Sequence, residues 1–191
     1  QIGEQLWMKE NLKVTHYNNG DEIPTGYSNS EWADLNLTAT GAYAVYDDNE
    51  SNADTYGYLY NWYAVETENL APEGWHVPTD DEIKELEMYL GMSQSEADGT
   101  EWRGTNEGSK LAGRADLWND GDLENNPEFG TSGFNFLPGG TRDPNTGNYY
   151  DMGIYGYFWS STENSNAWHR SLYYDNSGFY RYSYDKKNGF S

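Results

Sequence analysis

The segment WHRSLYYDNSGFYRYSY, residues 168–184, best indicates how this chain folds. Two runs rich in aromatic residues, Trp168–Tyr174 and Phe179–Tyr184, have the composition of β-strands. Between them lies Asp175-Asn176-Ser177-Gly178, a composition typical of a tight turn. The segment therefore predicts an antiparallel hairpin near the carboxyl end.

Alternation along these strands predicts one face rich in tyrosine. Successive side chains of a strand point to opposite faces, so Tyr180, Tyr182 and Tyr184 share one face. A buried phenol needs a hydrogen-bond partner, whereas Tyr, Ser, Asn and Asp are common on binding surfaces. We expect ligand contacts from Trp168, His169, Tyr173, Tyr174, Asp175, Asn176, Tyr180, Arg181, Tyr182 and Tyr184. The alternative is that one tyrosine face packs beneath the loops.

Upstream of the hairpin, the clearest element is a helix over residues 80–90. Thr79 followed by Glu82 forms a capping-box pattern, in which each side chain satisfies a free backbone donor of the first turn. Ile83, Leu86 and Leu90 recur at helical spacing, and Gly91 provides the stop.

The remaining elements are expected to be short. Tyr155–Ser160 is a strand candidate, and residues 4–16 alternate well enough for one or two strands. Helices are expected near Glu31–Leu35 and Ser109–Arg114, while Gly57–Ala64 fits either a helix or a strand. With 21 glycines among 191 residues, the chain is predicted to be one loop-rich α+β domain.

Charge and cysteine content exclude several classes of function. A net charge of −21 disfavours nucleic acid and anionic membranes, because both would repel the chain. The 18 tyrosines and 8 tryptophans distinguish it from an acidic disordered segment. No cysteine is present, so disulfides and thiolate chemistry are absent. No apolar run approaches the ~20 residues that a membrane helix needs.

One acidic loop is a candidate calcium site. Asp120, Asp122, Glu124 and Asn126 alternate, so their oxygens could converge on a hard cation. An EF-hand is excluded because Thr131 stands where the loop's final glutamate would be. In so acidic a chain, a solvated loop is the alternative interpretation.

Catalysis has little support in the sequence. The three histidines show no zinc-binding spacing, and no nucleophile or phosphate-binding motif is present. Carboxylate pairs occur throughout, so a glycan hydrolase stays an alternative. We expect a binding protein rather than an enzyme, with an inert spacer module as a further alternative.

Six blocks in order resemble the Fibrobacter succinogenes major paralogous domain, called FISUMP. They are IGEQLWMKENL (2–12), YGYLYNWYAV (56–65), APEGWHVPTDDE (71–82), GFNFLPGGTR (133–142), GYFWSSTE (156–163) and NGFS (188–191). The resemblance spans the whole chain. It implies a C-type-lectin-like fold with two short helices and small antiparallel sheets, cut from a longer extracellular or cell-surface bacterial protein. The implied partner is a glycan, peptide or protein on another surface, with Ca²⁺ as a candidate cofactor and no membrane insertion by this domain.

The chain also departs from this pattern. Family members commonly carry cysteines and continue beyond NGFS, and the catalytic thiols of the similar formylglycine-generating enzymes are missing. Trp118-Asn119-Asp120 resembles the WND calcium motif of sugar-binding lectins, without its following cysteine. The carboxyl-terminal region alone resembles variable proteins of diversity-generating retroelements, whose mutable codons yield the residue types crowding 164–185.

Overall fold

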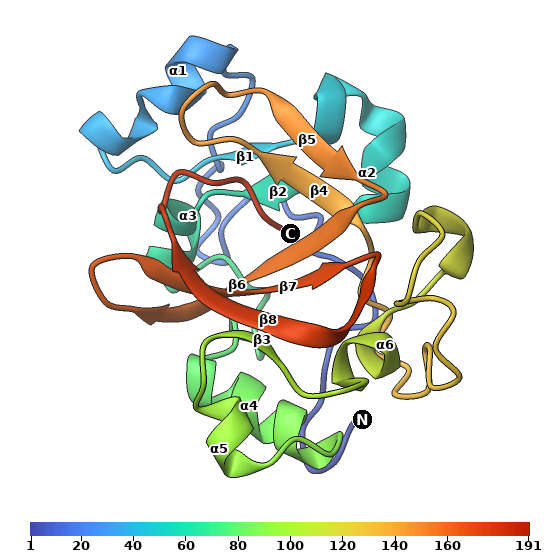
Figure 1. The fold of residues 1–191 in the computed structure, drawn as a ribbon. Helices are drawn as coiled ribbons and strands as arrows, with labels where there is room; N and C mark the ends of the chain where they lie inside the picture. Colours follow the sequence, from blue (N-terminus) through green and yellow to red (C-terminus); the bar gives the residue numbers. More distant parts are fainter.

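A four-stranded antiparallel sheet in the order β3-β8-β7-β6 lies at the centre of the computed structural model, which describes residues 1–191 (Figure 1). The strands are β1 (Tyr43–Ala44), β2 (Leu59–Tyr60), β3 (Glu101–Arg103), β4 (Gly139–Arg142), β5 (Tyr149–Met152), β6 (Tyr155–Glu163), β7 (Ala167–Tyr173) and β8 (Asn176–Tyr184). The α-helices are α1 (Asn29–Ala33), α2 (Glu50–Tyr56), α3 (Trp62–Glu66), α4 (Asp80–Tyr89), α5 (Gln94–Ala97) and α6 (Glu107–Leu111). Short 3-10 turns span Leu35–Leu37, Tyr46–Asp48 and Ala115–Leu117. The loop-rich α+β class is confirmed, although the six helices exceed the two that the lectin-like resemblance implied.

The predicted hairpin is present as β7 and β8, but its turn is displaced. His169 pairs with Tyr182 and Arg170 with Arg181, and the register shifts between Ser171 and Tyr173. The turn therefore lies at residues 174–175. Gly178 is part of β8, and a glycine is needed there because a Cβ would lie 2.8 Å from the Arg103 carbonyl oxygen of the neighbouring strand. Its role is close packing rather than the turn.

Helix α4 forms as the capping box predicts. The Thr79 hydroxyl accepts from the Glu82 amide, and the Glu82 carboxylate accepts from the Thr79 amide at 2.8 Å. Ile83 and Leu86 are fully buried on its inner face. Gly91 ends the helix with a φ of 127°, a region that favours glycine.

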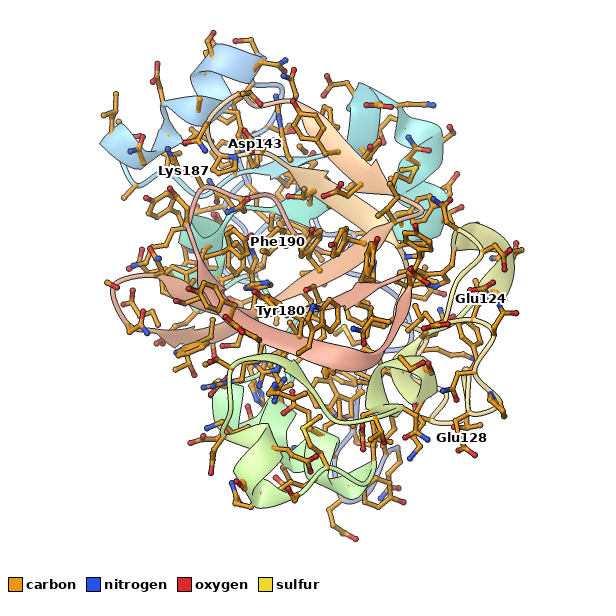
Figure 2. All side chains as sticks on the ribbon, in the orientation of Figure 1. Glu124, Glu128, Asp143, Tyr180, Lys187 and Phe190 are labelled. Atoms are coloured by element: carbon orange, nitrogen blue, oxygen red, sulfur yellow. The ribbon has the colours of Figure 1, made fainter.

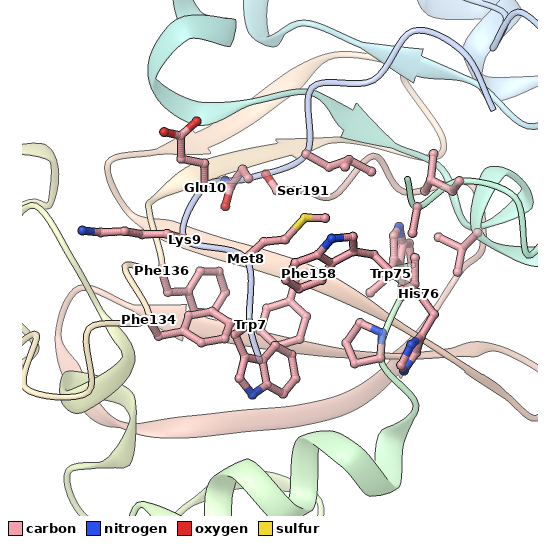
Figure 3. Close-up of a pocket in the computed structure, with 18 of the residues that line it drawn as sticks. Trp7, Met8, Lys9, Glu10, Trp75, His76, Phe134, Phe136, Phe158 and Ser191 are labelled. Carbon is pink, nitrogen blue, oxygen red and sulfur yellow. The ribbon is translucent and has the colours of Figure 1, made fainter. Parts of the chain in front are cut away.

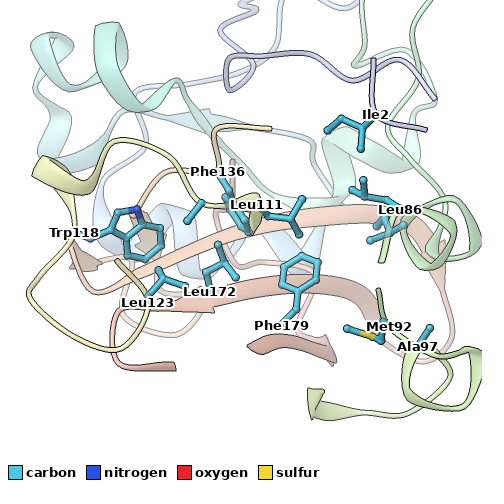
Figure 4. Packing of buried hydrophobic residues seen from close by; sticks show 12 residues of the cluster. Ile2, Leu86, Met92, Ala97, Leu111, Trp118, Leu123, Phe136, Leu172 and Phe179 are labelled. Carbon is cyan, nitrogen blue, oxygen red and sulfur yellow. The ribbon is translucent and has the colours of Figure 1, made fainter. Parts of the chain in front are cut away.

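The sheet's inner face builds the larger of two hydrophobic cores. Leu172 and Phe179 from the hairpin meet Ile83 and Leu86 of α4 and Leu111 of α6, all nearly inaccessible to solvent (Figure 4). A second core gathers around Tyr60, Trp62, Trp159 and Phe190. A smaller cluster surrounds Trp32 beneath β1.

Charged residues are also buried against this inner face. The network consists of Asp80 and Glu87 of α4 with Arg103, Arg170 and Arg181 of the sheet, each at most 6% exposed. Arg170 donates to Glu87 at 2.5 Å and to Asp80 at 2.8 Å. Buried charges are tolerated only when they are paired and hydrogen-bonded, and these pairs join helix to sheet.

Several expected elements differ in the structure. Residues 4–16 do not form strands, because Asn11 and Trp7 contact other segments instead of pairing along an edge: Asn11 donates to the Tyr56 carbonyl, and the Trp7 ring lies 5.3 Å from Phe134. Residues 57–64 divide into β2 and α3 at Asn61, whose side chain caps α3. None of the helices combines the length and apolar character required to cross a membrane.

Candidate ligand-binding face

The outer face of the central sheet is covered by aromatic rings, which we call the aromatic face (Figure 2). It consists of Trp102 on β3, Tyr180, Tyr182 and Tyr184 on β8, His169 and Tyr173 on β7, and Tyr155 and Tyr157 on β6. Every strand of the sheet contributes, because alternation places every second residue on this side.

The rings form a continuous contact series across the four strands. Trp102 lies 5.1 Å from Tyr180, Tyr180 6.1 Å from Tyr182, and Tyr182 6.2 Å from Tyr184, measured between ring centroids. Toward the β6 edge of the same face, Tyr155 stacks on Tyr173 of β7 with ring centroids 4.7 Å apart. Neighbouring rings hold one another in position, so the face is ordered before any ligand arrives.

Part of this face is open to solvent. Trp102, Tyr182 and Tyr184 are 39%, 43% and 45% exposed, which is high for large aromatic side chains at the centre of a domain. Tyr155 and Tyr180 are half-buried. A contiguous exposed aromatic patch on a sheet is a recognised mark of an interaction surface.

His169 forms the floor of the face. It is fully buried, its ring lies 4.8 Å from that of Tyr184, and neither ring nitrogen has a hydrogen-bond partner. Burial, assisted by the positive charge of Arg170, lowers the pKa of His169 to about 3. The imidazole is therefore neutral at physiological pH and acts as a packed aromatic ring.

Charge is divided between the two sides of the sheet. Arg103, Arg170 and Arg181 all point to the inner face, where Asp80 and Glu87 pair with them. Strand β5 instead places the Asp151 carboxylate beside the aromatic face, where it accepts from the Tyr157 hydroxyl at 3.3 Å. Burial raises the pKa of Asp151, and the Tyr157 hydrogen bond opposes that rise.

The ten residues expected to contact ligand divide between the faces. Five of them share the aromatic face: His169, Tyr173, Tyr180, Tyr182 and Tyr184. Trp168 and Arg181 lie on the other side, with the guanidinium carbon 3.9 Å from the centre of the indole ring. Arg181 is committed to Asp80, so the structure gives it no role in orienting a ligand on the aromatic face.

The remaining three residues expected to contact ligand lie at the end of the hairpin. Tyr174 packs against the larger core, and Asp175 is exposed at the turn. The Asn176 side chain accepts from the Gly178 amide at 2.8 Å, which holds the start of β8.

Sequence reasoning missed four residues of the site. Tyr155 and Tyr157 follow the same alternation as the hairpin, so the pattern of β6 could have identified them. Trp102 lies on β3, which pairs with β8 from a distant part of the chain, and Asp151 comes from the separate hairpin of β4 and β5. Only the tertiary structure brings these last two to the face.

Comparison with protein families decides the relationship of this chain to others. The model of the Fibrobacter succinogenes major domain matches residues 1–191. The chain belongs to this family. The resemblance to the FISUMP domain is thereby confirmed over residues 1–191. Neither a curated protein nor a solved structure matches the chain.

In this FISUMP domain the acidic loop is held by its own hydrogen bonds. The Asn125 amide donates to Asp120 at 2.9 Å and to Glu124 at 3.1 Å, and Glu124 also accepts from the Gly121 amide. Asn126 donates to Ser177 at 3.2 Å. Asp120 and Glu124 share the Asn125 amide, but no group of three or more His, Cys, Asp or Glu side chains is arranged to hold a metal. Calcium binding at this loop stays a prediction.

The FISUMP domain also contains an apolar cavity of about 490 Å³ between its two main cores (Figure 3). The amino-terminal segment 5–12 crosses it, and Trp7, Phe134 and Phe158 line it beside Trp75. At one end His76 contacts Glu82 at 2.8 Å. The cavity lies at the junction of the two cores and is lined on one side by the amino-terminal segment.

Proposed function

We propose that this FISUMP domain is an extracellular or cell-surface binding module whose ligand, a glycan or peptide, lies on the aromatic face. The supporting observation is the layer of rings contributed by all four strands of the central sheet, in which Trp102, Tyr182 and Tyr184 are open to solvent. Aromatic rings stack on the apolar faces of sugars and on peptide side chains, and their hydroxyls add hydrogen bonds.

The construction of the sheet suits this role. The inner face carries the core residues Leu172 and Phe179 and the paired arginines, so the strands are held from behind. The outer rings have few rotatable bonds and are already in contact with one another. Binding therefore costs little side-chain entropy, which is how rigid aromatic anchors gain affinity.

A double substitution tests the proposal. Tyr182→Ala with Tyr184→Ala removes the two most exposed tyrosines of the face, and we expect hits on glycan and peptide arrays to weaken at least about tenfold. Thermal unfolding should change little. Tyr89→Ala is the matched control, because Tyr89 is 66% exposed on α4, behind the sheet.

Other outcomes would favour the alternatives. An array without hits, or hits unaffected by the double variant, would contradict the proposal and favour the spacer interpretation. Turnover of a glycan that depends on Asp151 would favour a hydrolase, which needs a second carboxylate across the substrate.

A further inference from the structure

The sheet separates its cations from its exposed aromatic rings. Its three arginines are all on the inner face, bound to Asp80 and Glu87. Lys186 and Lys187, which follow β8, are paired with Glu163 and Asp185. The aromatic face thus carries no cation of its own, although rings are good partners for cations.

The charged groups close to the face are carboxylates instead. The Asp151 carboxylate accepts a hydrogen bond from the Tyr157 hydroxyl. Burial raises the pKa of Tyr180 most, and the neighbouring Tyr184 and the charge of Glu101 raise it further. His169 beneath the rings is neutral because its pKa is lowered to about 3. Nothing at this surface repels a positive ligand, and a chain of net charge −21 attracts one from a distance.

Asp151 is held in an unusual manner for a surface carboxylate. Its φ of 71° lies in the left-handed region, which residues other than glycine adopt infrequently. It is half-buried, and a single phenol is its only side-chain hydrogen-bond partner. A half-buried carboxylate with one neutral donor has unused acceptor capacity, which a charged donor would satisfy most strongly.

We propose that the aromatic face recognises a basic peptide segment, with a lysine or arginine side chain bound to the Asp151 carboxylate beside the hydroxyls of Tyr155 and Tyr157. This inference rests on the proposed function and specifies its ligand. Tyr155 stacks on Tyr157 with centroids 5.5 Å apart, Tyr173 also stacks on Tyr155, and Phe190 also stacks on Tyr157. The two tyrosines are therefore held in a fixed stack beside the carboxylate, and they offer a ligand their hydroxyl oxygens rather than their ring faces. A guanidinium carries five N–H donors, so it can donate to the carboxylate and to a phenol oxygen simultaneously.

The experiment compares a cation with its neutral isostere. The probe is a Gly-Ser octapeptide with one central arginine, and its comparison peptide carries citrulline, which keeps the shape and loses the charge. Each is titrated into the ¹⁵N- and tyrosine-labelled 191-residue chain at 150 mM salt. We expect the arginine peptide to shift the Tyr155 and Tyr157 resonances and to bind at least about tenfold more tightly than the citrulline peptide.

A pair of variants assigns the effect to one carboxylate. Asp151→Asn keeps a residue that tolerates the left-handed conformation, so folding should be retained, and we expect it to lose most of the preference for arginine. Asp81→Asn is the control, because its side chain is 93% exposed on α4 and it removes the same charge. Equal binding of both peptides, or equal loss in both variants, would overturn the inference.

The two proposals fail in different ways. If neutral glycans bind the face through Tyr182 and Tyr184 while the arginine peptide does not, the binding function stands and the cationic ligand is wrong. If no array ligand and no peptide perturbs the aromatic face, both proposals are wrong.

Discussion

The guanidinium of Arg181 and the carboxylate of Asp80 form a two-point ion pair, with Nε to Oδ1 at 2.9 Å and Nη2 to Oδ2 at 2.7 Å. The pair joins β8 to the first turn of α4 across 101 residues of sequence. It fixes the inner side of the strand whose outer side carries three tyrosines of the aromatic face. The aromatic face is thus positioned from behind by a buried ion pair.

Breaking this pair should destabilise the fold strongly. Arg181→Leu leaves the Asp80 carboxylate buried with one fewer partner, and we expect a loss of about 3–5 kcal/mol in the free energy of unfolding. Urea denaturation measures it. Arg114→Leu is the control, because its bidentate pair with Asp116 is exposed to solvent and should contribute little to stability. Similar losses in both variants would contradict a structural role for the buried network.

Asp80 should also make the fold sensitive to strong acid. Burial acts to raise its pKa, but hydrogen bonds from Arg181 and the charge of Arg170 outweigh burial and hold the pKa well below its usual range. The folded state therefore binds its proton less readily than the unfolded state. Stability from this group is complete above about pH 4 and declines as the pH falls further. Asp80→Asn should flatten the acid limb of a stability-against-pH curve while lowering stability at pH 7.

His169 should make the stability of the fold depend on pH over a higher range than Asp80 does. Its pKa is about 3 in the folded chain because burial and Arg170 disfavour the imidazolium, whereas an exposed histidine titrates near pH 6.5. Unfolding therefore takes up a proton between these values, and stability should rise with pH from about 3 to 6.5.

The matching variant is His169→Phe, which keeps a ring against Tyr184 and removes the titration. Its melting temperature should change less between pH 4.5 and 7 than that of the unaltered chain. His76→Gln should leave the dependence in place, because the His76 side chain is 68% exposed. An unchanged slope in His169→Phe would show that other groups cause it.

Calcium binding by the acidic loop is tested by thermal unfolding with and without millimolar Ca²⁺. If Asp120, Asp122 and Glu124 bind the ion, the melting temperature should rise by about 2–4 °C for each kcal/mol of stabilisation. The rise should disappear in Asp120→Asn with Asp122→Asn. The absence of any rise in the unaltered chain would favour the solvated-loop interpretation.

Elements governed by local patterns were predictable from sequence. The Thr79–Glu82 capping box located the start of α4, and alternation assigned Tyr180 and Tyr182 to one face. In both, the deciding interactions lie within a few residues of chain. The same reasoning suffices for β6.

Elements governed by distant partners were not predictable. Arg181 was expected to contact the ligand, but it pairs with Asp80 instead. Asp80 lies 101 residues away in the sequence, so nothing in the hairpin reveals that pairing. The amino-terminal segment alternates like a strand but lies across the cavity between the cores. The hairpin turn lies at residues 174–175 rather than at the predicted 175–178, and Gly178 instead allows close contact between β8 and β3.

The alternation along β8 separates two kinds of mutational constraint. Phe179 and Arg181 are buried in the core and its ion network, whereas Tyr182 and Tyr184 end in solvent. Codons at the outward positions can therefore accumulate changes with little effect on folding, while those between them are held by selection for stability. Such a strand allows the chemistry of its outward surface to change while the scaffold behind it stays the same.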